Sequence, residues 1–191
     1  MKEEKEITVL VLTSFDNLND ILKTQGFKEK ERYRVCDTYM INKDHYDKNM
    51  KTLDILKLCV LVRDVKGIEK KLLYKYKEYD SNGDILYQTK TSCTIEDIQS
   101  AIKFMEVVGY KTLFTIDDLN IVYENNDMEI AVQLVNEKYI FIEFEYHDGK
   151  NKRYASIEKL KSQFNKLSLP ILENNYFIKK AELIYNDTYK K

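Results

Sequence analysis

Residues 139–146 read Y-I-F-I-E-F-E-Y and carry two carboxylates, Glu143 and Glu145, inside an otherwise apolar run. Successive side chains of a β-strand point to opposite faces, so the two carboxylates share one face. A strand this apolar is expected to be at least half-buried, where two like charges need a cation nearby. A divalent metal ion or a cluster of Lys and Arg would provide the compensating charge.

The composition describes one ordered domain spanning residues 1–191. Its 31 basic and 32 acidic residues leave a net charge of −1, which gives no overall field for DNA or an anionic membrane. We therefore expect neither DNA nor a membrane as a partner. Fifteen Tyr and eight Phe, with five Gly and one Pro, indicate a compact fold with many half-buried rings.

The cysteines and the first residues bear on the cellular compartment. Cys36, Cys59 and Cys93 are odd in number and widely spaced, which argues against a zinc site or a disulfide framework and favours small core residues. The opening M-K-E-E-K-E-I does not match a signal peptide, and no apolar run reaches the roughly 18 residues that span a bilayer. We expect a reduced, cytoplasmic, soluble protein.

Hydrophobic periodicity predicts an alternation of strand groups and helices. Strands are expected over residues 4–13, 33–41, 53–65, 70–79, 85–93, 111–116, 120–123, 129–135 and 139–146, with a turn at 81–84. Helices are expected from residue 16 to Gly26, over 94–109 and over 156–167, a charged connector over 28–32, and helix or strand over 177–185. This order predicts an α+β barrel of about eight antiparallel strands, built as two similar halves with helices outside.

Several short motifs occur in an order that resembles the CYTH domain, the triphosphate tunnel family named for class IV adenylate cyclases and thiamine triphosphatases. The resemblance covers nearly the whole chain. The residues that carry it are Glu4, Glu6 and Thr8 for the opening E-x-E-x-K, Asp37, Thr38 and Tyr39 for D-T-Y, Val60–Arg63 for L-R-I-R, Leu73–Lys75 for T-Y-K, and Phe141–Glu145 for F-x-E-I-E. The segment K-K-A-E-L-I near the end is also similar to the family.

The resemblance implies a closed antiparallel tunnel whose inward side chains hold a triphosphate or nucleotide. Metal ligands would be Glu6, Glu143 and Glu145, binding Mg²⁺ or Mn²⁺ if the protein is active. Phosphate ligands would be Arg63, Lys75 and Lys90, because charge-assisted bonds from Lys and Arg neutralise phosphate oxygens.

The chain departs from the family pattern on the same expected lining. The opening lysine is Thr8, or Leu10 after a shift of one same-face step, and the first arginine of L-R-I-R is Leu61. The other departures are Gln88, Lys90 and Ser92 for R-x-E-x-E, Asp118 and Asn120 for K-x-R, and Gln133 for the metal-binding aspartate of the seventh strand. These losses favour a degenerate member, a pseudoenzyme that binds a phosphorylated ligand with weak or no catalysis.

Two other functions compete with this one. An active metal-dependent triphosphatase or adenylate cyclase would use the same three glutamates. A non-catalytic interaction module would fill the tunnel with its own side chains, with Leu61 and Leu10 pointing inward. The lysines of residues 66–77, interleaved with tyrosines, also suit nucleic-acid binding, but the alternation of a hairpin explains them equally well.

Overall fold

The computed structural model describes residues 5–79, 85–172 and 175–190, and their side chains except those of Lys77, Tyr79 and residues 85–88. The strands are β1 (Glu6–Val11), β2 (Lys28–Asn42), β3 (Val60–Val65), β4 (Glu69–Tyr79), β5 (Ile85–Thr94), β6 (Tyr110–Glu124), β7 (Glu129–Val135) and β8 (Tyr139–Glu145). The helices are α1 (Phe15–Thr24), α2 (Thr52–Lys57), α3 (Ile98–Val107), α4 (Ile157–Asn165) and α5 (Lys180–Tyr189), with short 3-10 turns at Lys43–His45 and Lys150–Arg153. None of the helices in the described ranges has the length and apolar character needed to cross a membrane.

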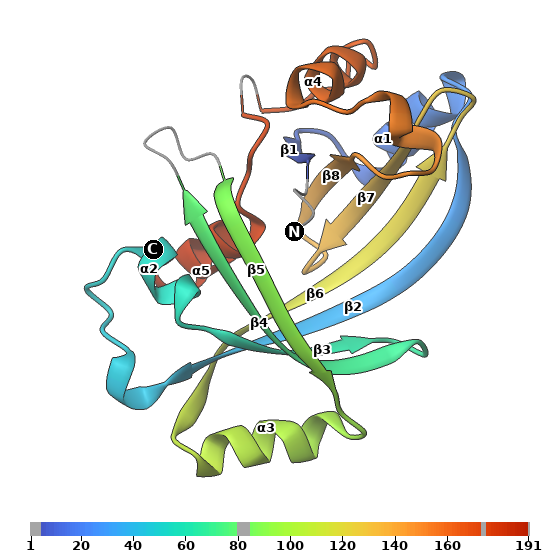
Figure 1. The fold of residues 1–191 in the computed structure, drawn as a ribbon. Coiled ribbons are helices and arrows are strands. Elements are labelled where there is room, and N and C mark those ends of the chain that lie inside the picture. The colour runs from blue at the N-terminus through green and yellow to red at the C-terminus, as the bar shows by residue number, and fades with distance from the viewer. Residues whose placement is uncertain (1–4, 80–84, 173–174, 191) are drawn as a thin grey trace. The chain divides into compact units, whose positions relative to one another are not determined.

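The eight strands form one sheet in the order β1-β8-β7-β6-β2-β3-β4-β5 (Figure 1). The pairs β1 and β8, β8 and β7, and β7 and β6 are antiparallel, as are β2 and β3, β3 and β4, and β4 and β5. The predicted α+β class with an eight-stranded antiparallel sheet is therefore confirmed. The chain divides into two compact units, of which unit 1 is Met1–Tyr33 with Asp118–Ile178 and unit 2 is Arg34–Asp117 with Lys179–Lys191.

Unit 1 is built around one apolar face of β1, β8, β7 and β6, against which α1 and α4 pack (Figure 1). Helix α1 begins at the N-cap Ser14, whose hydroxyl accepts from the Asn17 N–H at 3.3 Å. The core includes Ile7 and Val9 of β1, Ile142 and Phe144 of β8, Leu18 and Leu22 of α1, and Leu160 and Phe164 of α4. These strand positions alternate with Glu6, Thr8, Glu143 and Glu145, so the carboxylates lie on the opposite face.

The outer edge of β1 is covered by residues from near the end of the chain. Thr8 donates its N–H to the Tyr176 carbonyl at 2.8 Å, and Ile178 donates to the Thr8 carbonyl at 3.0 Å. Further along, the Leu12 N–H reaches the Pro170 carbonyl at 2.7 Å. The backbone groups of an edge strand are thus satisfied on both sides.

Unit 2 packs helices against β2, β3 and β4. Met40, Val62 and Met105 form a core beneath α3 on one face. In the same unit, Tyr39 stacks on Phe114 with ring centroids 4.4 Å apart, and Phe114 meets Tyr185 of α5 edge-on at 5.9 Å. A hydrogen bond of 2.7 Å from Thr52 Oγ1 to Asn186 Oδ1 joins α2 to α5.

Two segments were assigned to the wrong kind of element, because hydrophobic residues alone do not mark where these elements begin and end. Residues 28–32 were predicted as a charged connector, but they belong to β2. A strand is held by hydrogen bonds between backbone groups, so its side chains can be charged. Here they form ion pairs, such as the one of 2.5 Å between Lys30 Nζ and Glu129 Oε2. Residues 53–65, predicted as one strand, contain α2 before β3 begins, and Thr52 and Ile55 are buried at helical spacing.

Two other segments also differ from expectation. Residues 111–116 and 120–123 belong to one strand, β6, because Asp117 and Asp118 do not interrupt it: the Arg34 guanidinium binds Asp117, and Asp118 is buried. Residues 177–185 contain both elements, a bridge from Phe177 to Thr8 and then α5. The turn predicted at 81–84 lies outside the described residues.

Asn151 is hydrogen-bonded to backbone groups at the ends of β7 and β8. It is 1% exposed, accepts from the Glu129 N–H at 2.9 Å, and donates to the carbonyls of Glu129 at 2.8 Å and Glu145 at 2.9 Å. Asn151→Ala should lower the free energy of unfolding by about 3 kcal/mol, because buried backbone groups lose their partners. Urea denaturation followed by circular dichroism measures this. The exposed neighbour variant Lys152→Ala should change it by less than about 0.5 kcal/mol, and equal effects of the two variants would contradict the assignment.

Candidate functional site

The acidic face of unit 1 is the face opposite its apolar core. Residues directly opposite in antiparallel strands share a face, and Glu6 lies opposite Glu145 while Thr8 lies opposite Glu143. Glu143 in turn pairs with Ala131, and Phe141 with Gln133. The acidic face is defined here as Glu6, Thr8, Glu143, Glu145, Gln133, Asn120 and Asp118.

Much of this face is polar and buried at once. Thr8 is 9% exposed, and Asn120 and Gln133 are each 4% exposed. Gln133 Nε2 donates to Asn120 Oδ1 at 3.1 Å, and Asn120 Nδ2 donates to the Asp118 carbonyl at 3.3 Å. Such an amide network meets the requirement that buried polar groups be hydrogen-bonded.

The charges of the acidic face affect the pKa of Tyr33, a residue of β2. Burial raises the pKa of its hydroxyl, and the negative charges of Glu143, Glu31 and Asp118 raise that pKa further. Sequence analysis did not select Tyr33, because its neighbours depend on strand pairing.

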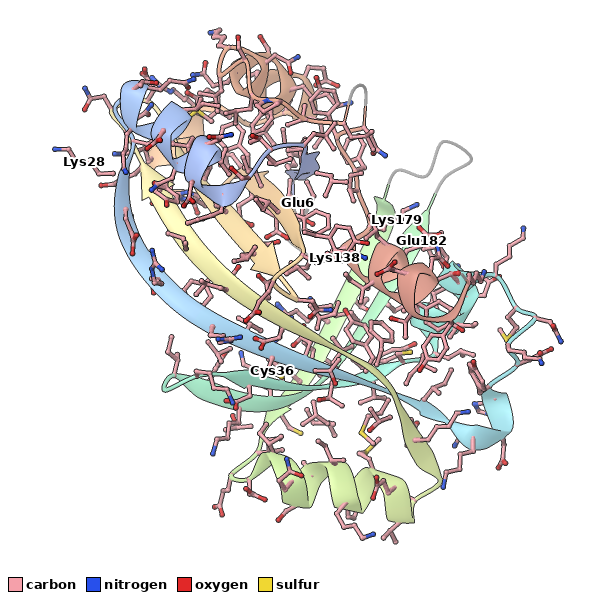
Figure 2. All side chains as sticks on the ribbon, turned by 180° about the vertical axis from the view of Figure 1, so that it is seen from behind. Glu6, Lys28, Cys36, Lys138, Lys179 and Glu182 are labelled. Atoms are coloured by element: carbon pink, nitrogen blue, oxygen red, sulfur yellow. The ribbon has the colours of Figure 1, made fainter. Side chains whose placement is uncertain are left out.

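The three predicted metal ligands share this face. Glu6, labelled where β1 begins in Figure 2, and Glu143 are half-buried, whereas Glu145 is exposed. Across the described ranges, no group of three His, Cys, Asp or Glu side chains is arranged to hold a metal ion. Glu4 lies outside the described residues.

The basic face of unit 2 places cations opposite one another. Arg63 of β3 lies directly opposite Lys71 of β4, and Lys75 of β4 lies directly opposite Lys90 of β5. By the same register, this face also carries Asp37, Tyr39, Leu61, Glu69, Leu73 and Ser92, and these residues with the four cations define the basic face. Like charges directly opposite in a sheet repel, so each pair needs a counter-charge.

Arg63 and Lys71 have carboxylate partners on this face. Arg63 donates from Nε to Asp37 Oδ1 at 2.7 Å and from Nη2 to Asp37 Oδ2 at 2.5 Å, a two-point pair with only 22% and 10% of the side chains exposed. Lys71 Nζ lies 2.6 Å from Glu69 Oε1. Lys75 is half-buried, and Lys90 is exposed.

An apolar row crosses the basic face between the two cation pairs. Tyr39 lies opposite Leu61, and Leu61 lies opposite Leu73. Leu61 is 3% exposed and Leu73 is 1% exposed. Leu61, the residue that the motif resemblance compares with a family arginine, thus lies on this face. Ser92, opposite Leu73, is exposed, and the side chain of Gln88 lies outside the described set.

The predicted site residues therefore form two groups, one in each unit. Glu6, Glu143 and Glu145 lie together on the acidic face, and Arg63, Lys75 and Lys90 lie together on the basic face. Sequence analysis missed Lys71. The period of two in K-K-L-L-Y-K, which puts Lys71 on the face of Lys75, was the signal that would have found it.

The cysteines are free thiols that differ in environment. Burial raises the pKa of Cys59 to about 12, which agrees with its predicted core position. Burial and then the charge of Asp117 raise the pKa of Cys36. Cys93 of β5, which lies opposite Leu72 of β4, is exposed, so its expected place in the core was wrong. The raised pKa values disfavour the nucleophilic thiolate form at Cys36 and Cys59.

The fold resembles that of several solved structures. The PH1819 protein of Pyrococcus horikoshii OT3 aligns with a TM-score of 0.64 at 17% identity, over 97% of this chain and 99% of that chain. HpAC1 of Hippeastrum, a candidate adenylyl cyclase with a dominant triphosphatase activity, aligns with a TM-score of 0.64 at 13% identity, over 97% and 96%. A candidate adenylate cyclase of Vibrio parahaemolyticus aligns with a TM-score of 0.57 at 14% identity, over 96% and 99%.

These likenesses confirm the predicted CYTH-like fold. Neither a protein-family model nor a curated protein matches the sequence. At these identities the comparison extends to the fold alone.

Unit 2 contains two Arg–Asp ion pairs that differ in how exposed they are. The Arg63 and Asp37 pair is largely buried, whereas Arg34 Nη2 meets Asp117 Oδ2 at 2.6 Å with 47% and 41% of the side chains exposed. Arg63→Gln should lower the free energy of unfolding by about 2 kcal/mol, because it leaves a buried carboxylate poorly paired. Arg34→Gln should cost less than about 1 kcal/mol. Thermal and urea denaturation of both variants measure the difference, and a larger loss for Arg34→Gln would refute this ranking.

Proposed function

We propose that the protein binds a phosphorylated small molecule, a triphosphate or nucleotide, and has little or no catalytic turnover. The observation that carries this proposal is the basic face, on which Arg63, Lys75 and Lys90 lie together with Lys71. A phosphate accepts charge-assisted hydrogen bonds from such cations and relieves the repulsion between directly opposed ones. The closed tunnel implied by the CYTH resemblance is part of this proposal.

The acidic face supports the absence of efficient turnover. Metal-dependent phosphoryl transfer needs several carboxylates converging on one or two ions, and the described residues contain no group of three ligands arranged in this way. Gln133 takes the position at which the family pattern has an aspartate, and its amide is bonded to Asn120 instead. If Mg²⁺ or Mn²⁺ binds at all, Glu6, Glu143 and Glu145 are the proposed ligands.

A specific observation favours a second candidate, a non-catalytic interaction module. Leu61 and Leu73 are almost fully buried on the basic face, and Tyr39 and Phe114 stack in the same unit. Part of the surface that a ligand would occupy in a tunnel protein is thus taken by the chain's own side chains. Such a protein would have kept the fold and lost the ligand.

Calorimetry with tripolyphosphate and ATP tests the proposed binding. We expect saturable heat at low ionic strength, weakened by added salt, because the contacts are between cationic side chains and phosphate oxygens. Phosphate release with Mg²⁺ or Mn²⁺ should stay at the level of a no-protein blank. HpAC1 is described with a dominant triphosphatase activity, which makes triphosphate hydrolysis the reaction to assay.

The glutamates supply the control. Glu143→Gln should leave both anion binding and the phosphate-release rate unchanged, since the proposed ligand contacts are on the basic face. Metal-dependent turnover that Glu143→Gln abolishes would establish the active enzyme instead. Absence of binding by either anion would leave the interaction module as the better account.

A further inference from the structure

β5 is the last strand of the sheet, and part of it is an exposed edge. Among the strands that the structure describes, β4 is the one hydrogen-bonded to β5 (Figure 1). The strand at the other end of the sheet, β1, is covered by backbone hydrogen bonds from residues 170–178. On β5, residues 90–94 are all exposed. An open strand edge can pair with a further strand, and proteins usually cover or interrupt such edges.

The register of β4 and β5 determines which backbone groups face this edge. Ile95 donates its N–H to the Lys70 carbonyl at 3.0 Å, which continues the register of the two strands. In an antiparallel ladder, bonded residues alternate with residues whose N–H and C=O both point away from the partner strand. Lys90, Ser92 and Thr94 therefore direct both backbone groups outward. The ladder is regular here, since its register shift lies at the opposite end of β5.

Charges are placed symmetrically about Cys93 on this segment. Lys90 lies three residues before Cys93 and Glu96 three residues after it, and both side chains are exposed. If a second copy pairs its own residues 90–96 antiparallel to these, centred on Cys93, each Lys90 lies directly opposite a Glu96. Unlike charges that are directly opposite stabilise a pair of strands.

The other registers lack this match. Because the outward backbone groups alternate, the pairing can shift only in steps of two residues. Shifts in one direction set Lys90 opposite Thr94, then Ser92, and then Lys90 of the second copy, where two like charges oppose each other. A shift in the other direction sets Glu96 opposite Ser92. The register centred on Cys93 is therefore the one that the charges favour.

We propose that residues 90–96 are a self-association surface whose occupant is a second copy of this chain, paired antiparallel about a twofold axis at Cys93. Such an interface is isologous, because the same patch of each copy contacts the other, and the two sheets become continuous. So short a pairing buries little surface. We therefore expect a weak dimer whose population depends on protein concentration.

This inference goes beyond the proposed function, because anion binding by the basic face needs no second copy. Lys90 belongs to that face, but its ammonium group has three N–H donors and can contact a carboxylate and a phosphate together. Self-association is measured without any ligand. Its test is therefore independent of phosphate binding.

Analytical ultracentrifugation of the full chain tests the charge pairing. The parent should show a concentration-dependent equilibrium of monomer and dimer. Lys90→Glu sets glutamates against each other at both ends of the pairing and should raise the dimer dissociation constant at least about tenfold. The double variant, Lys90→Glu with Glu96→Lys, restores opposed unlike charges and should return to within about threefold of the parent. Lys28→Glu makes the same charge change at an exposed position of β2 and is the matched control, within about twofold.

A backbone variant tests the edge itself. Ser92→Pro removes an N–H that points outward and keeps the bonds from β5 to β4, because proline is tolerated where the N–H of an edge strand faces solvent. The dimer dissociation constant should rise at least about tenfold. The circular dichroism spectrum should match that of the parent, and the charge variants decide the question should this variant not fold.

Cys93 reports the register. Directly opposite residues at a non-hydrogen-bonded position have Cα atoms about 4.5 Å apart, within the range that a disulfide spans. In a Cys36→Ser background, copper phenanthroline takes two electrons and two protons from the pair of Cys93 thiols and should give a covalent dimer on a non-reducing gel. Cys93→Ser in the same background should give none, because Cys59 is buried.

The outcomes separate this inference from the proposed function. A parent that stays monomeric at every concentration overturns the inference and leaves the outward groups of β5 for closure of the proposed tunnel. A dimer that Lys90→Glu leaves intact, or that the double variant does not restore, overturns this surface as its interface, as does a covalent dimer that forms equally well without Cys93. Phosphate binding is untouched by these results, because calorimetry with tripolyphosphate tests it separately.

Discussion

Strict alternation of apolar and charged side chains along β8 and β1 is the constraint on which the rest of unit 1 depends. Ile142 and Phe144 are fully buried against α1 and α4, and this fixes the faces of Glu143 and Glu145. A shift of one residue would bury both carboxylates among leucines and expose the core. The position of the acidic face is therefore a consequence of core packing and needs no ligand to maintain it.

In unit 2 the corresponding constraint is electrostatic as well as apolar. Strand register sets Arg63 against Lys71 and Lys75 against Lys90, arrangements that cost free energy unless compensated. Asp37 and Glu69 compensate the first pair from within the chain. The ion pair of Arg63 and Asp37 thus helps this register of β2, β3 and β4 to be tolerated.

Sequence alone predicted the fold class, β7 with its observed bounds, and the shared face of Glu143 and Glu145, because these depend on a local period of two. It failed at residues 53–58, where a short apolar run suits helix and strand equally, and at 28–32, where charged residues conceal a strand. The Asp37 and Arg63 pair was beyond sequence reasoning. Those residues are 26 positions apart and meet only through the register of β2 and β3.

The backbone bridges along β1 also determine when this part of the molecule can assemble. The partners of β1 are β8 on one side and Pro170, Leu172, Tyr176 and Ile178 on the other, all more than 125 positions further along the sequence. The pairing of β1 therefore closes a long loop of chain, whereas the β3–β4 hairpin closes between sequence neighbours. We expect the β3–β4 hairpin to form early in folding and β1 to join its sheet late, which leaves an apolar strand dependent on protection from aggregation in the meantime.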